Sequence, residues 1–309
     1  MTTWIPPAPD ARRRSAATAM THGWVLVGVD GGEAGEAAVE FAARYAAPRG
    51  LRLELLHVAP EPAYAASDSA HARIGRQQRH QLLDTAAARA RELLGADDPG
   101  RVGAEIAYGG RVDRLLAAAE EGCELVVLGD QRRPQVDRLA TGSVLAGVAA
   151  RCTVPVIGVP AGWTPHAQDP VVVAAVKTCA DSGVLLDLAS AVAAEHGARL
   201  RVLQARDVQH AAPGHRGAWE EAARADLARL VATHCDRYPD LKVDVDVVSG
   251  QPARVIANAS AQADLLLLTR RPLVYSHGHL GGTGRAVLRE SRCPVAVLPP
   301  PTAGPGSGP

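Results

Sequence analysis

The sequence predicts an α/β fold made of two domains in tandem, each a parallel sheet that helices cover on both faces. Short apolar segments alternate with segments of helical periodicity along the chain, which is typical of parallel sheets. The same order of elements occurs twice, and such a repeat indicates two copies of one structural unit. With 309 residues, of which 47% are hydrophobic, the chain is long enough to bury a core in each copy.

The first copy contains short apolar segments that we expect to be strands, with a helix after each strand except the last. The expected strands are residues 24–29, 51–58, 102–108, 125–128 and 154–159. The expected helices are residues 33–47, 77–94 and 112–121, and another begins at Gly142-Ser143. Because a helix connects each strand to the next, the strands are expected to run parallel.

The second copy repeats these elements after residue 170. Its expected strands are residues 171–176, 197–205, 242–248, 264–268 and 294–298, and its expected helices include residues 181–196 and 219–237. The resulting boundaries are a disordered tail at 1–22, a first domain at 23–160, a linker at 161–170, a second domain at 171–300 and a disordered tail at 301–309.

Composition argues against several classes of function. The 33 basic and 33 acidic side chains balance, and only 3% of residues are aromatic, so neither charge nor base stacking favours nucleic acid, and charge does not favour an acidic membrane. No apolar run approaches the ~20 residues of a membrane span, and the first residues lack the apolar core of a signal peptide. The five cysteines show no C-x-x-C spacing, which favours reduced thiols and a cytoplasmic protein.

One stretch, residues 124–160, has the features of a phosphate site. A buried strand at residues 125–128 is followed by a loop that begins with Gly129, and a second small-residue turn, Gly142-Ser143, starts a helix. Glycines let the backbone approach an anion, and a helix N-terminus favours negative charge. The pattern therefore predicts backbone N–H groups placed around a phosphate.

The spacing of Gly129, Arg132, Gly142 and Ser143 resembles G-x2-G-x9-G-[ST], the nucleotide motif of the universal stress protein family, with Arg132 in place of one glycine. The resemblance covers nearly all of residues 23–300 and implies a tandem member of that family. It implies two five-stranded Rossmann-like domains of the adenine nucleotide alpha hydrolase-like type, with strand order 3-2-1-4-5. It also implies an internal pseudo-dimer, in which strand 154–159 pairs with strand 294–298, and leaves a homodimer open.

The resemblance further implies an ATP site in the first domain, with Mg²⁺ as the accompanying ion. The matching residues are Asp30, Val58, Gly129, Gly142, Ser143 and Val144, with Arg132 at the position of the missing glycine. Asp30 and Ser143 also have structural interpretations, as a turn residue and as a helix N-cap. A non-glycine residue held in a left-handed conformation costs about 1–2 kcal/mol. Arg132, Arg133 and Arg138 could instead donate to phosphates, or form a solvated loop face.

The second domain departs further from the motif. Lys177 stands in the place of Asp30, Thr269 in the place of Gly129 and Pro272 in the place of Arg132, while Gly282-Thr283 remains. Pro272 offers no N–H, so the phosphate loop cannot be rebuilt there and a nucleotide is not expected. Lys177 could hold an anion at its strand end or be an ordinary surface lysine.

The function that the resemblance implies is a stress-response regulatory or sensor module that binds ATP in its first domain and meets protein partners. The alternative is a nucleotide-free interaction protein in which both sites are vestigial. An enzyme is not expected, because no nucleophile, base and orienting acid share a recognisable catalytic spacing. A metal site is not expected either, because His277 and His279 lack a full ligand set.

Overall fold

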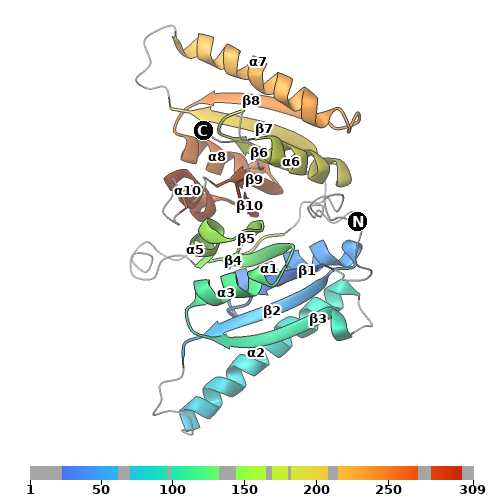
Figure 1. Cartoon of the computed structure of the whole chain (residues 1–309), viewed down its shortest axis with the longest axis vertical. Coiled ribbons are helices and arrows are strands. Elements are labelled where there is room, and N and C mark those ends of the chain that lie inside the picture. The colour runs from blue at the N-terminus through green and yellow to red at the C-terminus, as the bar shows by residue number, and fades with distance from the viewer. Residues whose placement is uncertain are drawn as a thin grey trace. The chain divides into compact units, whose positions relative to one another are not determined.

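The computed structural model describes residues 23–61, 70–95, 99–131, 144–164, 169–179, 182–207, 215–270 and 280–300 (Figure 1). Among these residues the chain divides into two compact units, one ending at Thr164 and the other beginning at Asp169. We call them the first half and the second half. Each half is an α/β unit, so the predicted fold class and internal repeat are confirmed.

The first half contains a parallel sheet. Its strands are β1 (Trp24–Gly28), β2 (Arg52–Ala59), β3 (Val102–Tyr108), β4 (Leu125–Asp130) and β5 (Val156–Pro160). They lie in the order β3-β2-β1-β4-β5, and every pair of neighbours in that order runs parallel. This is the order 3-2-1-4-5 that the family resemblance implies.

Helices cover both faces of the first sheet (Figure 1). They are α1 (Glu33–Ala46), α2 (Ala70–Leu94), α3 (Arg111–Glu120) and α5 (Val144–Arg151). Helix α1 packs against α2, and α3 packs against α5. Helix α2 begins seven residues before the expected start at Gln77, because the helix continues through Gly75. A single glycine costs a helix only about 1 kcal/mol.

The second half repeats the arrangement. Its strands are β6 (Val171–Val176), β7 (Arg199–Arg206), β8 (Val243–Ser249), β9 (Leu265–Thr269) and β10 (Val295–Leu298), in the order β10-β9-β6-β7-β8. Its helices are α6 (Gly183–Glu195), α7 (His215–Cys235), α8 (Pro252–Ala259) and α10 (Gly282–Glu290). Neighbouring strands in this order are again parallel. The pairing expected between strands 154–159 and 294–298 stays a prediction.

The central strands are apolar at consecutive positions because they are buried on both faces of the sheet. In β1 and β4, consecutive residues are buried, which places side chains against helices on both faces of the sheet. Phe41 and Tyr45 on α1 are the largest buried side chains of the first half. Trp163 packs edge-to-face against Phe41, with ring centroids 5.3 Å apart, so the segment after β5 folds back onto α1.

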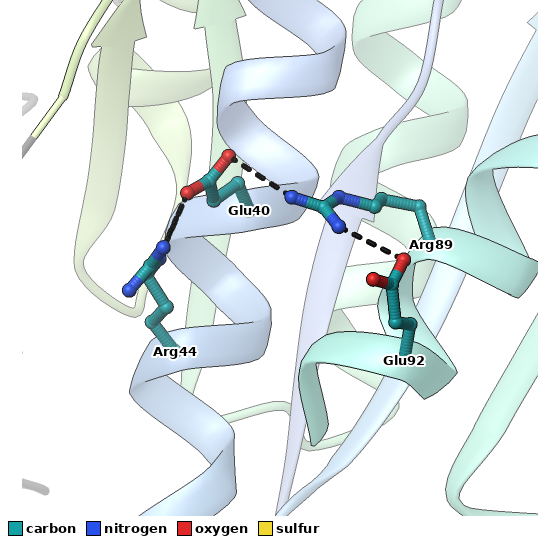
Figure 2. Close-up of polar contacts among 4 residues, drawn as sticks. All are labelled: Glu40, Arg44, Arg89 and Glu92. Atoms are coloured by element: carbon teal, nitrogen blue, oxygen red, sulfur yellow. Dashed lines mark hydrogen bonds and ion pairs between the residues drawn. The ribbon is translucent and has the colours of Figure 1, made fainter. Parts of the chain in front are cut away.

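A cluster of charged side chains joins α1 to α2 on the surface of the first half (Figure 2). Glu40 on α1 accepts from Arg44 one turn later, at 2.7 Å from its Nη2. The other oxygen of Glu40 lies 3.8 Å from Arg89 on α2, whose Nη1 donates to Glu92 at 2.8 Å. The carboxylate of Glu40 therefore lies between cations of both helices.

Across the parts of the chain that the structure describes, no helix is both long enough and apolar enough to cross a membrane.

Candidate functional site

The carboxyl ends of β1 and β4 form the centre of the candidate site. Gly28 pairs with Leu128 across these two strands, so Asp30 and Asp130 follow at neighbouring strand ends. Gln131 reaches back from the end of β4, and its Nε2 donates to Asp30 Oδ2 at 2.7 Å. In an open α/β sheet with this strand order, ligands bind in the crevice at this edge.

Asp30 is exposed but held in place. Its Oδ1 accepts from the backbone N–H of Gly32 at 3.0 Å, and Gly32 is the residue that precedes the first turn of α1. This contact matches the turn interpretation of Asp30. A carboxylate has about four acceptor positions, so Asp30 retains capacity to accept hydrogen bonds from a ligand.

Gly129 is required by the packing of α1 on the strand ends. A Cβ atom at this position would lie 2.4 Å from the carbonyl carbon of Ala34 and 2.7 Å from the nitrogen of Gly35. A Cβ at Gly35 would in turn lie 2.6 Å from Asp30 Oδ1. The backbone of the first turn of α1 therefore lies directly on Gly129, which gives this glycine a structural role in addition to the expected approach to a phosphate.

Val58 lies at the same edge, near the end of β2. It pairs with Ala107 of β3 and is buried, with 8% of its surface exposed. Its neighbour His57 contacts the carbonyl oxygen of Val29 through Nδ1 at 2.8 Å, which joins the ends of β1 and β2. Val144 is the first residue of α5 and is half-buried.

The structure thus brings three predicted site residues, Asp30, Val58 and Gly129, to the ends of three adjacent strands. Arg132, Gly142 and Ser143 lie outside the described residues. Sequence reasoning missed Gln131. It directly follows the strand, but its contact with Asp30 depends on β1 and β4 being neighbours.

Several carboxylates lie at this edge, together with Arg114, whose Nε donates to the carbonyl of Tyr108 at the end of β3 at 2.7 Å. Asp30 and Asp130 end neighbouring strands, and Glu33 and Glu36 lie in the first turn of α1, where they complement the helix dipole. A nucleotide phosphate here would need compensating cations. Among the described residues no group of three or more His, Cys, Asp and Glu side chains could hold a metal ion.

The corresponding edge of the second half differs, as the sequence predicts. Lys177 follows β6 with an exposed side chain, and its carbonyl oxygen accepts from Gln204 Nε2 at 3.1 Å. Thr269 ends β9 and pairs with Leu298. Helix α10 begins at Gly282, so Gly282-Thr283 does form a helix N-terminus. Pro272 lies outside the described residues.

Two cysteines that precede strands, Cys123 and Cys293, are buried. Burial raises the pKa of both Cys123 and Cys293 to about 12. Cys152, which matches Cys293 in the repeat, is also buried. These three cysteines are free thiols.

Both halves of the chain resemble known proteins. The sequence matches the universal stress protein family over residues 24–160 and again over 170–299. The universal stress protein Rv2005c of Mycobacterium tuberculosis is 31% identical over 301 residues, which cover 89% of this chain and 96% of the relative. A second one from that organism, Rv1996, is 28% identical over 307 residues, covering 88% and 94%.

A solved universal stress protein from Archaeoglobus fulgidus has the same fold. It superposes with a TM-score of 0.59 at 19% sequence identity, covering 90% of this chain and 96% of its own. Because the family matches each half separately and the mycobacterial relative aligns along almost the whole chain, this protein belongs to the universal stress protein family as a tandem, two-domain member.

Proposed function

We propose that this universal stress protein is a cytoplasmic regulatory or sensor module that binds ATP, with Mg²⁺, in its first half. The observation that carries the proposal is the position of Asp30. Its carboxylate is exposed at the central strand ends and oriented by two contacts, from Gly32 N–H and from Gln131. A pre-oriented acceptor in this crevice suits the hydroxyl and amino groups of a nucleoside.

The remaining residues have complementary roles in the proposed site. Val58 contributes apolar surface beside Asp30, and the backbone of Gly142 and Ser143 donates N–H groups to the phosphates at the start of α5. Arg132 offers a guanidinium in place of the family's glycine. Bound Mg²⁺ offsets the repulsion between the phosphates and the carboxylates of this edge. In this proposal the first half binds ATP and does not hydrolyse it.

The test is isothermal titration of ATP into the full chain, with and without Mg²⁺. We expect about one ATP per chain, tighter binding with Mg²⁺, and a rise in melting temperature that follows RT ln(1 + [L]/Kd). Gly142→Asp places a carboxylate beside the phosphates and should abolish binding. Its matched control is Gly217→Asp in α7, where an added Cβ atom meets nothing within 4 Å.

A second variant tests Asp30 itself. Asp30→Asn replaces an oxygen acceptor by an amide and should weaken ATP binding by about tenfold or more. Glu92→Gln neutralises an exposed carboxylate at the far end of α2 and should leave binding unchanged. Normal ATP affinity in both Gly142→Asp and Asp30→Asn would show that the site is elsewhere.

The alternative is a nucleotide-free interaction protein. It is favoured by the finding that Asp30 and Gly129 each have a structural task, one in the turn before α1 and the other in the docking of α1. No heat and no thermal shift with ATP, ADP or AMP would support this alternative, and the search would then move to protein partners.

A further inference from the structure

Arg114, near the start of α3, holds a cation at the carboxyl edge of the first sheet. Its Nε donates to the carbonyl oxygen of Tyr108, the last residue of β3, at 2.7 Å. The guanidinium lies against Gly109, where a Cβ atom would be 3.2 Å from Nε and 3.8 Å from Nη2 of Arg114. A hydrogen bond and a backbone contact therefore orient a side chain that is exposed.

Most of the donors of Arg114 are available to a ligand. A guanidinium has five N–H groups, and within the described part of the chain the hydrogen bond from Nε is the one that Arg114 makes through them. The adjacent carboxylate of Asp113 lies 3.1 Å from Nη2 of Arg151 on α5. The N–H groups on the two Nη atoms of Arg114 thus form no hydrogen bond or ion pair with the residues that the structure describes.

Strand register places this cation in line with two residues of the candidate site. Asp30 is level with Val58 of β2, because Gly28 and Leu56, two residues before each, pair with one another. Val58 in turn pairs with Ala107 of β3. Adjacent strands are about 4.8 Å apart, so the ends of β1 and β3 are about 10 Å apart, with Val58 between them.

Val58 and α3 lie on the same face of the sheet. A Cβ atom at Gly28 would be 3.4 Å from Leu115 of α3, so position 28 points to the face that α3 covers. Gly28 and Leu56 are register partners, and alternate residues of a strand share a face. Val58 therefore points to the α3 face as well, and Arg114 stands on the helix above it.

The corresponding position of the second half has no cation. Gly109 precedes α3 as Gly250 precedes α8, and the residue five positions later is Arg114 in one half and Val255 in the other. Each packs on its glycine: Cγ2 of Val255 lies 3.1 Å from a Cβ atom placed at Gly250. Because valine fills the same position, the packing does not require an arginine. The half that keeps Asp30 is the half that has the donor.

We propose that Arg114 holds the base of the nucleotide bound in the first half, by donating N–H groups of its Nη atoms to acceptor nitrogens of the ring. This inference rests on the proposed function, which places the phosphates at the start of α5. Helix α5 packs against β4 and β5, on one side of β1, whereas Arg114 is anchored at β3, on the other side. A nucleotide with its ribose at Asp30 and its phosphates at α5 directs its base over Val58 toward Arg114.

The test is titration of ATP, ADP and AMP into the full chain and into Arg114→Gln. The base is common to the three ligands, so we expect the variant to bind each of them about tenfold more weakly, by the same factor. Arg114→Val, which introduces the residue of the second half, should show the same loss while circular dichroism reports an intact fold. The matched control, Arg52→Gln, changes an exposed arginine at the amino end of β2 and should leave binding unchanged.

CTP tests the position of the base separately. A pyrimidine ring is shorter than a purine, so the parent chain should prefer ATP to CTP, and this preference should shrink in Arg114→Gln. The proposal is overturned if the parent binds ATP and Arg114→Gln binds it equally, or if the loss grows from AMP to ATP, which would indicate a contact with the phosphates. Absence of nucleotide binding by the parent would overturn the proposed function itself, so the two failures are distinguishable.

Discussion

At the scale of single residues, Gly129 shows how one position can serve both folding and binding. The family motif places a glycine there for a phosphate, whereas the structure places the backbone of α1 against it. Because α1 also positions the turn that Asp30 occupies, the glycine shapes the candidate site even before any ligand is considered.

We expect Gly129→Ala to destabilise the first half by about 1–3 kcal/mol, since the added methyl group overlaps the backbone of α1. Chemical denaturation without any nucleotide measures this loss. Gly217→Ala in α7, where a methyl group meets nothing within 4 Å, should be neutral or slightly stabilising. Equal stability of the two variants would contradict the packing role of Gly129.

The buried thiols give a second prediction at this scale. Because burial raises the pKa of Cys123 and Cys293 to about 12, both remain protonated at neutral pH, and only a thiolate reacts with disulfide reagents. At about pH 8 these two should react with such a reagent far more slowly than after denaturation. Rapid labelling of either thiol in the folded chain, located by peptide mapping, would be the contrary result.

At the scale of elements, each half joins its first helix to its long helix through a carboxylate at the same repeat position. Glu40 on α1 faces Arg89 on α2 (Figure 2). Asp187 on α6, the matching residue, lies 2.7 Å from Nδ1 of His234 on α7. A histidine takes the place of the arginine in the second half, and a polar contact between the two helices is present in both halves.

A double-mutant cycle with Asp187→Asn and His234→Gln should give a coupling of about 0.2–1 kcal/mol. The value is modest because Asp187 is 44% exposed and solvent screens the pair. The unfolding of the chain in urea provides the measurement. A vanishing coupling would mean that apolar packing between α6 and α7 alone holds these helices together.

At the scale of the whole molecule, the two halves share one fold but differ at the positions of the nucleotide motif. The first half keeps Asp30, while the second has Lys177, Thr269 and Pro272 at the motif positions. The two halves share their strand order and differ in the residue that follows the first strand, which is Asp30 in one and Lys177 in the other. We therefore expect one nucleotide for each chain.

The variant Lys177→Asp tests the expectation that only the first half binds a nucleotide. Lys177→Asp restores the carboxylate of the first strand end, yet we expect the variant to bind no second ATP, because Thr269 and Pro272 still prevent the phosphate loop from forming. Equilibrium dialysis should give about one ATP for each chain, as in the parent. Two ATP molecules bound to the variant would show that charge alone had closed the second site.

The sequence by itself determined the α/β class, the repeat, most strand positions and the loss of the motif in the second half. These features follow from local periodicity and from the order of residue types, which the chain carries directly. The start of α2 was misplaced because Gly75 resembles a turn signal, although in the structure the helix continues through it.

Only the tertiary structure decided which residues meet at the sheet edge. Gln131 and Asp30 are 101 residues apart, and Gly129 lies beneath α1 because β4 is the neighbour of β1. Such contacts depend on strand order and register, which long-range packing fixes and which local periodicity does not encode.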